Sequence, residues 1–208
     1  MYSVLIIGAG SIGNHLTYAC RQKNWSVDIY DVDSTALERM KGEIYPSRYG
    51  SWDPAINILG VIDWVEDKYD FIVIGTPPDT HIGIATEVLK KATPKVLLIE
   101  KPLCTPYFEG YNNFKKELSG KETTVLVGYN HNLTQNTKRL QALLRQDIVG
   151  NPSSIHVRWL EHWGGIFRAH PWLDGPQDCY LGNWRRGGGA CVARQPRLLH
   201  GLRHAEAR

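Results

Sequence analysis

The chain has 208 residues, of which 42% are hydrophobic and 22% are charged, and its formal net charge is +3. This composition is typical of an ordinary globular protein. The chain is long enough for one large domain, or for one domain and part of another. The net charge is too small to indicate a nucleic acid or an anionic membrane as a partner, so we expect neither.

The cysteines and histidines predict no disulfide framework and no metal site. None of the cysteines has Cys-x-x-Cys spacing, which suits a reducing cytosol, and the histidines after residue 130 match no ligand motif. No apolar run is long enough to span a membrane, and no basic segment precedes the first one. We therefore expect a cytoplasmic protein without a structural metal.

Short apolar strands alternate with amphipathic helices through the first half of the chain. The strands are expected at about residues 3–7, 26–31, 71–75, 95–100 and 124–130. The helices are expected after the first strand, after Asp33, from about Thr80 and near 106–118, whereas residues 42–66 show no clear pattern and no site is expected there. In the first helix, Ile12, Leu16, Ala19 and Cys20 predict the buried stripe. This alternation indicates an α/β fold with right-handed crossovers and a parallel sheet covered on both faces.

The segment IGAGSIGNH at 7–15 ends the first predicted strand and begins a helix. Its glycines form the Gly-x-Gly-x-x-Gly pattern of a doubly wound Rossmann fold that binds a dinucleotide. The first glycine makes the tight turn, the second lets the backbone approach the pyrophosphate, and the third lets helix and strand pack closely. The alternative is a tight turn without a ligand. We expect the cofactor contacts to be Gly8, Gly10, Ser11, Ile12 and Gly13.

Asp31 ends the next predicted strand, where a carboxylate can accept the two ribose hydroxyls of a dinucleotide and repels a 2′-phosphate. The nearest arginine along the chain is Arg39, which follows too late to accept that phosphate. We therefore expect NAD as the cofactor and consider NADP less favoured. The alternative for Asp31 is a solvated charge at the end of a strand.

Three further motifs follow in order: GTPPDTH at 75–81, EKPL at 100–103 and GYN at 128–130. Together with the glycine pattern they resemble the Gfo/Idh/MocA family, which includes glucose–fructose oxidoreductase and inositol dehydrogenase. The segment WRRGGGA at 184–190 also resembles the start of the long second-domain helix of that family. The resemblance covers about residues 3–190, and the combination of motifs is specific although each motif alone is not.

The resemblance implies a Rossmann domain over residues 1–129 and the start of an α+β substrate and oligomerisation domain over 130–190. It implies NAD-dependent hydride transfer to or from a hydroxyl or keto carbon of a sugar, nucleotide sugar or polyol. A full-length member would form a homo-oligomer. Lys101 would be the catalytic lysine. The other implied cofactor contacts are Thr76, Pro77, Pro78, His81, Glu100, Asn130, Trp184 and Arg185.

The chemistry supports Lys101 independently, because oxidation of an alcohol requires a base for the hydroxyl proton and the reverse reaction requires an acid. Each assignment around it has an alternative. Lys101 can be a surface cation before a proline turn, and His81 can bond to nearby backbone at the start of its helix. Glu100 can orient Lys101 or merely end the strand.

Residues 191–208 depart from the family pattern, since they contain arginine but no lysine, aspartate or aromatic residue. Family members continue here with an apolar turn and a histidine that assists the lysine. A shifted reading frame is one hypothesis, and a natural short variant and a cloning scar are others. The second domain would then be incomplete. The alternative functions are a reductase of another substrate, a cofactor-binding but catalytically impaired fragment, or a nucleotide-binding regulator of the same fold.

Overall fold

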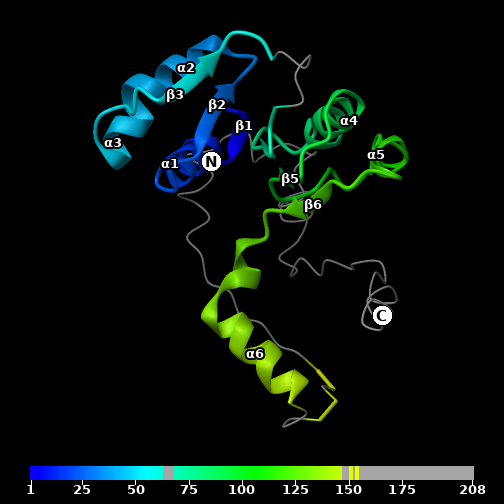
Figure 1. Ribbon diagram of the computed structural model, residues 1–208. Coiled ribbons are helices and arrows are strands. Elements are labelled where there is room, and N and C mark those ends of the chain that lie inside the picture. Colours follow the sequence, from blue (N-terminus) through cyan, green and yellow to red (C-terminus); the bar gives the residue numbers. More distant parts are fainter. Residues whose placement is uncertain (63–67, 147–149, 152, 155–208) are drawn as a thin grey trace, which may run out of the picture. The chain divides into compact units, whose positions relative to one another are not determined.

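The computed structural model describes residues 1–62, 68–146, 150–151 and 153–154 (Figure 1). The chain divides into two compact units, Met1–Glu161 and His162–Arg208, and all described residues belong to the first. The sequence SSIHVRWLEHW at 153–163 alternates in a way that predicts a strand with one wet face, but only 153 and 154 of it are described. Trp184, Arg185 and the tail at 191–208 also lie outside the described residues.

Six parallel strands form one sheet in the order β3-β2-β1-β4-β5-β6. This is the strand order of the Rossmann fold, so the predicted fold is confirmed. The strands are β1 (Ser3–Ile7), β2 (Ser26–Tyr30), β3 (Ile56–Leu59), β4 (Phe71–Ile74), β5 (Val96–Ile99) and β6 (Thr124–Val127).

Helices connect these strands and continue beyond the last one. They are α1 (Ser11–Arg21), α2 (Ser34–Arg39), the π-helical turn η1 (Met40–Ile44), α3 (Tyr45–Tyr49), α4 (His81–Lys91), α5 (Tyr111–Leu118), the 3₁₀ turn η2 (Asn130–Leu133) and α6 (Gln135–Arg145). The order can be followed in Figure 1, where the blue and cyan helices belong to β1–β3 and the green helices α4 and α5 belong to β4–β6.

The sheet has a separate apolar core on each face. Successive side chains of a strand point to opposite faces, so Leu5 and Ile7 join one cluster and Val4 and Ile6 join the other. The first cluster includes the buried side chains of α4 and α5, and the second includes those of α2 and η1. Burial on both faces explains why β1 and β4 are continuous apolar runs without polar alternation.

The buried face of α1 differs from the predicted stripe. Ile12 is 38% exposed, and the buried residues of this helix are Gly13, Asn14 and Thr17. The cause is the closeness of helix and strand, because a Cβ on Gly13 would collide with the Gly8 carbonyl oxygen. Leu16 and Cys20 of the predicted stripe are partly buried against the second apolar cluster, so the stripe is confirmed there and wrong at the exposed Ile12.

Asp33 caps α2 as expected, since its carboxylate accepts a hydrogen bond from the Thr35 N–H at 2.9 Å. The segment 42–66, which shows no clear sequence pattern, contains the end of η1, all of α3 and the edge strand β3 within its described residues. In β3 only Ile56 is buried, so its four residues lack the apolar run that marks β1 and β4.

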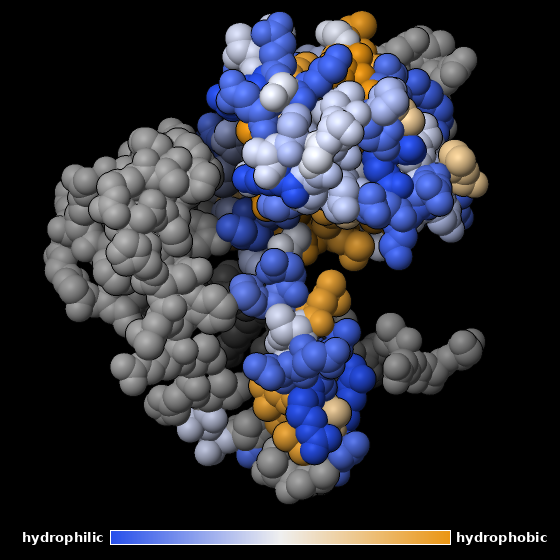
Figure 2. Space-filling model, turned by 90° about the vertical axis from the view of Figure 1, so that its left-hand side faces the viewer, coloured by the Kyte–Doolittle hydropathy of each residue, from blue (hydrophilic) through white to orange (hydrophobic). Residues whose placement is uncertain are grey.

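The segment from β6 into α6 exposes apolar side chains within the described residues. Leu126 is 48% exposed, Tyr129 50%, Leu133 72% and Leu140 47%. The spacing of Leu133, Leu140, Leu143 and Leu144 predicts a helix in this segment. It is present as α6, although Leu133 itself belongs to η2. Hydrophobic patches interrupt the mostly hydrophilic surface in Figure 2.

Asp70 links three central strands at their amino ends. Its carboxylate accepts hydrogen bonds from the Ser3 N–H at 2.9 Å and from the Lys95 ammonium at 2.7 Å, beside the starts of β1 and β5. The hydrogen bond from Lys95, followed by that from the Ser3 backbone, lowers the pKa of Asp70 from 3.8 to about 2. Folding therefore favours the ionised carboxylate.

We expect Asp70→Asn to lower the free energy of unfolding at neutral pH. The free energy of unfolding of the variant should also fall less than that of the unmutated chain when the pH is lowered. A lowered pKa in the folded state contributes stability that is complete above about pH 4 and is lost as the pH falls through about 2. Urea unfolding between pH 7 and pH 2 measures this effect. The unmutated chain should approach the variant at low pH. The control Glu38→Gln removes an exposed carboxylate of α2. Its free energy of unfolding should change between pH 7 and pH 2 by the same amount as that of the unmutated chain. Parallel curves for the unmutated chain and Asp70→Asn would contradict the assignment.

Candidate functional site

The candidate site lies where the strand order reverses. From β1 the chain proceeds to β2 and β3 on one side, and from β4 it proceeds to β5 and β6 on the other. The connections after β1 and β4 therefore diverge at the carboxyl ends of these strands, where open α/β sheets form the crevice that binds their ligands.

The glycines after β1 and β4 bring the backbone together at this crevice. Gly8 has φ +112°, and a Cβ there would lie 2.8 Å from the Gly75 carbonyl oxygen. Gly13 packs still more closely on the Gly8 carbonyl, whereas a Cβ on Gly10 would meet nothing within 4 Å. Two of the three fingerprint glycines are thus required by packing, and Gly10 leaves open space.

The amino end of α1 provides an anion-binding surface beside this space. Gly10 occupies the N-cap position and supplies no side-chain cap, and the first helical bond runs from the Asn14 N–H to the Gly10 carbonyl at 2.9 Å. Ser11 and Ile12 begin the helix and are exposed. Unpaired amide groups and the helix dipole at such an end favour a phosphate.

Asp31 ties the glycine turn to the end of β2. One carboxylate oxygen accepts the Ala9 N–H at 2.7 Å and the other accepts the Asp33 N–H at 2.9 Å. Each oxygen retains a further lone pair, so the half-buried group can still accept ribose hydroxyls. It therefore shapes the turn and offers an acceptor beside it.

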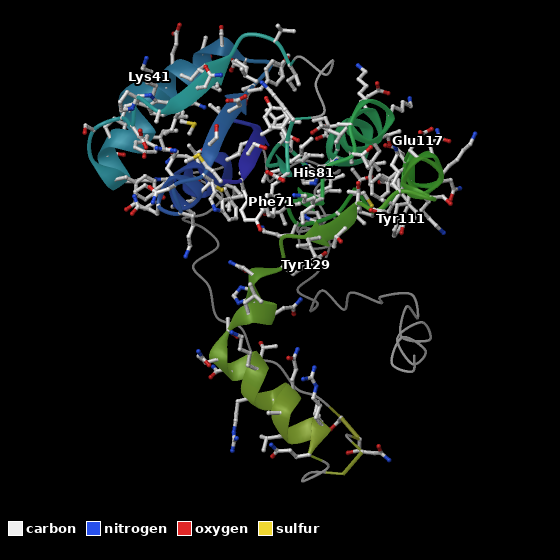
Figure 3. All side chains as sticks on the ribbon, in the orientation of Figure 1. Lys41, Phe71, His81, Tyr111, Glu117 and Tyr129 are labelled. Atoms are coloured by element: carbon white, nitrogen blue, oxygen red, sulfur yellow. The ribbon has the colours of Figure 1, made fainter. Side chains whose placement is uncertain are left out.

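His81 connects the loops that follow β4 and β5. It is fully buried, with Nε2 2.7 Å from the Thr76 carbonyl oxygen and Nδ1 2.9 Å from the Pro102 carbonyl oxygen (Figure 3). Both ring nitrogens thus lie against backbone carbonyl oxygens: the Thr76 contact is local, as in the alternative considered from the sequence, and the Pro102 contact is not. In this geometry His81 positions the two loops and has no ring nitrogen left for a ligand.

The rest of the loop after β4 is braced by hydroxyl groups. The Thr76 and Thr80 hydroxyls lie 2.7 Å apart, and the Thr80 hydroxyl also donates to the Pro77 carbonyl oxygen at 2.7 Å. Pro77 is exposed, and Thr76 and Pro78 are half-buried. The turn is therefore fixed from within while part of it faces outward.

Glu100 and Lys101 follow β5 directly. Lys101 is exposed, and its backbone N–H donates to the Glu100 carboxylate at 3.1 Å. The same carboxylate lies over Gly128, where a Cβ would come within 2.5 Å of Oε1. Gly128, in the motif after β6, therefore makes room for Glu100. The peptide bond between Lys101 and Pro102 is cis.

The predicted residues within the described part follow the carboxyl ends of five neighbouring strands: the glycine turn after β1, Asp31 after β2, Thr76–Pro78 after β4, Glu100–Lys101 after β5 and Asn130 after β6. Asn130 is exposed and begins η2.

Arg48 is a residue of this region that the sequence did not indicate. Its Nη1 donates to the Ser11 hydroxyl at 3.1 Å, although it lies in the segment where no site was expected. No local signal marks it, because the contact joins α3 to the start of α1.

The described residues contain neither a candidate metal site nor a candidate membrane-spanning helix. No three His, Cys, Asp or Glu side chains there are grouped to hold a metal ion. None of the helices described is long and apolar enough to cross a membrane.

Comparisons with solved structures find the same fold. The chain matches the dehydrogenase WlbA of Chromobacterium violaceum, solved with NADH and UDP-GlcNAcA, at 17% identity and TM-score 0.56, covering 72% of this chain and 41% of that chain. It matches myo-inositol 2-dehydrogenase of Lactobacillus plantarum at 17% identity and TM-score 0.55, covering 72% and 42%. A putative NADPH-dependent oxidoreductase of Desulfitobacterium hafniense matches at 13% identity and TM-score 0.57, covering 72% and 41%.

This chain thus aligns with about two fifths of the length of these proteins. No curated protein matches it in sequence. The model of the Gfo/Idh/MocA family, described as an oxidoreductase family with an NAD-binding Rossmann fold, matches residues 2–129. The chain, with its glycine turn, its switch-point crevice and its parallel sheet, therefore belongs to the Gfo/Idh/MocA oxidoreductase family.

Proposed function

We propose that this chain binds NAD in the crevice between β1 and β4 and serves hydride transfer to or from a hydroxyl or keto carbon of a sugar, nucleotide sugar or polyol. The observation that carries the proposal is the arrangement at Gly10. An open glycine, the uncapped amino end of α1 and the Asp31 carboxylate lie together where a dinucleotide is bound in this fold.

When bound, NAD supplies the hydride acceptor. The amides at the start of α1 would hold its pyrophosphate, Asp31 would accept its ribose hydroxyls, and the loop after β4 would line its other half. This division places Lys101, at the end of β5, on the opposite side of the switch point from Asp31. Lys101 would take the substrate hydroxyl proton or return it.

The substrate class is supported by two of the structural matches. WlbA was solved with a nucleotide sugar, and the Lactobacillus plantarum protein is an inositol dehydrogenase. For this chain, turnover of a panel of sugars, nucleotide sugars and inositols with NAD tests the class. Fluorescence titration with NADH separately tests cofactor binding, so it distinguishes an enzyme from a protein that binds the cofactor without turnover.

We expect Asp31→Ala to weaken NADH binding by about 10- to 100-fold, because hydrogen bonds to a charged group contribute about 1.5–3 kcal/mol. NADPH binding should weaken less, since the variant also removes a charge that repels the 2′-phosphate. Titration with both nucleotides measures the change in preference. Equal affinity of the unmutated chain for NADH and NADPH would contradict the role of Asp31.

We expect Lys101→Met to lower turnover by about 10²–10⁴-fold, the usual contribution of general acid–base catalysis. Methionine keeps the apolar stem but can neither accept nor donate the proton, so NADH affinity should stay within about twofold. Steady-state kinetics with the substrate found in the panel measure this effect, and the pH–rate profile should lose one limb. Lys90→Met, on the exposed side of α4, is the matched control. A loss in turnover below about threefold would make Lys101 a surface residue.

We expect Gly128→Ala to destabilise the fold by about 1 kcal/mol or less, because its Cβ would displace the Glu100 carboxylate, which is the end of a flexible side chain. Thermal unfolding measures this cost. Gly83→Ala in α4, where a Cβ meets nothing within 4 Å, should be neutral or stabilising. In a Glu100→Ala background the cost of Gly128→Ala should largely disappear. An undiminished cost there would exclude the carboxylate as its cause.

A further inference from the structure

Arg48 brings a positive charge to the flank of the cofactor turn. It is exposed on α3, and its Nη1 lies 3.1 Å from the Ser11 hydroxyl and 3.4 Å from the Ser11 carbonyl oxygen. The same nitrogen lies 3.2 Å from Nε2 of His15, one helical turn further along α1. The guanidinium is therefore held against the first turn of α1.

Packed aromatic rings hold α3 in this position. The rings of Tyr49 and Tyr18 stack at 3.9 Å with an interplanar angle of 3°, and Tyr45 is buried with its ring 6.2 Å from that of Tyr18. The Tyr49 hydroxyl also hydrogen-bonds to Nδ1 of His15. Arg48 thus extends from a packed surface rather than from a free loop.

His15 is suited to accept a hydrogen bond from Arg48. Burial, and then the charge of Arg48, lowers the pKa of His15 below its usual value, which favours the neutral ring. In the neutral tautomer that accepts at Nε2, Nδ1 carries the proton and can donate to the Tyr49 hydroxyl. Both contacts of His15 then agree with one protonation state.

The guanidinium and the Asp31 carboxylate bracket the open glycine. Asp31 binds the amide of Ala9 and Arg48 binds Ser11, so Gly10 lies between the two charged groups. The Cα atoms of Ala9 and Ser11 are at most about 7 Å apart. Arg48 comes from the crossover between β2 and β3, which is the side of the turn where Asp31 also lies. In this fold the carboxylate at the end of the second strand marks the adenosine side of the dinucleotide.

A guanidinium beside the glycine turn is suited to bind a phosphate on the ribose of a dinucleotide. Only Nη1 of Arg48 hydrogen-bonds to the described residues, so Nε and Nη2 retain donors for a planar, bidentate contact. In dinucleotide folds an arginine near the ribose accommodates the 2′-phosphate of NADP, whereas a carboxylate favours NAD. Here both are present, with Asp33 as a second carboxylate beyond Asp31.

We propose that Arg48 binds the 2′-phosphate of NADPH, so that the site accepts NADPH as well as NADH although Asp31 favours NADH. The proposal rests on the proposed cofactor site at Gly10. It corrects the expectation drawn from Arg39, because the arginine that reaches the turn is not the nearest one along the chain.

The test is fluorescence titration of the whole chain with NADH and NADPH, before and after Arg48→Ala. We expect the variant to lose about 10- to 100-fold in NADPH affinity and less than about threefold in NADH affinity. The NADPH affinity of Arg48→Lys should lie between those of the unmutated chain and Arg48→Ala, because lysine keeps the charge but lacks the planar, two-pronged guanidinium group. Arg39→Ala, an exposed arginine of α2, is the matched control and should change neither affinity.

Competition experiments, in which 2′,5′-ADP or ADP displaces the bound nucleotide, test whether Arg48 contacts the 2′-phosphate, which only 2′,5′-ADP carries. Only 2′,5′-ADP should lose affinity in Arg48→Ala. Unchanged NADPH affinity in that variant, an equal loss for both nucleotides, or NADH binding without any NADPH binding by the unmutated chain would each overturn the assignment of Arg48. If the unmutated chain bound neither nucleotide, the proposed cofactor site itself would fail. Thermal unfolding of each variant separates these results from misfolding.

Discussion

The close approach of backbone to backbone at the switch point is the constraint on which the rest of this structure depends. Gly8 turns the chain against Gly75, and α1 packs on the Gly8 carbonyl through Gly13. Because no side chain separates these segments, the amino end of α1 lies directly at the carboxyl ends of β1 and β4. The space at Gly10 and the orientation of the helix dipole both follow from this contact.

Charged groups are arranged around that turn by elements distant in sequence. Asp31 reaches the turn from the end of β2 and Arg48 reaches it from α3, and both bind the backbone or side chains of residues 9–11. In the proposed cofactor site, their opposite charges would act on the same part of a dinucleotide. Cofactor preference in such a site is a balance between two groups rather than a property of either alone.

On the other side of the switch point, backbone contacts fix the residue assigned to proton transfer. His81 joins the carbonyl groups of Thr76 and Pro102, and Glu100 accepts the N–H of Lys101 while resting on Gly128. These contacts place the chain around Lys101 and leave its side chain exposed. Positioning through the backbone is what the proposed role of Lys101 in proton transfer requires.

The sequence by itself determined the parallel α/β fold, the glycine turn and the position of Asp31 after the second strand, because each depends on a periodicity or a turn contained in one short segment. It did not determine β3, whose four residues carry too few buried side chains, or the exposure of Ile12 on α1. The tertiary structure alone decided that Arg48 meets Ser11 and that the Glu100 carboxylate lies over Gly128. Such contacts join residues far apart in the chain, and their distance is set by the packing of helices on the sheet, which no local pattern encodes.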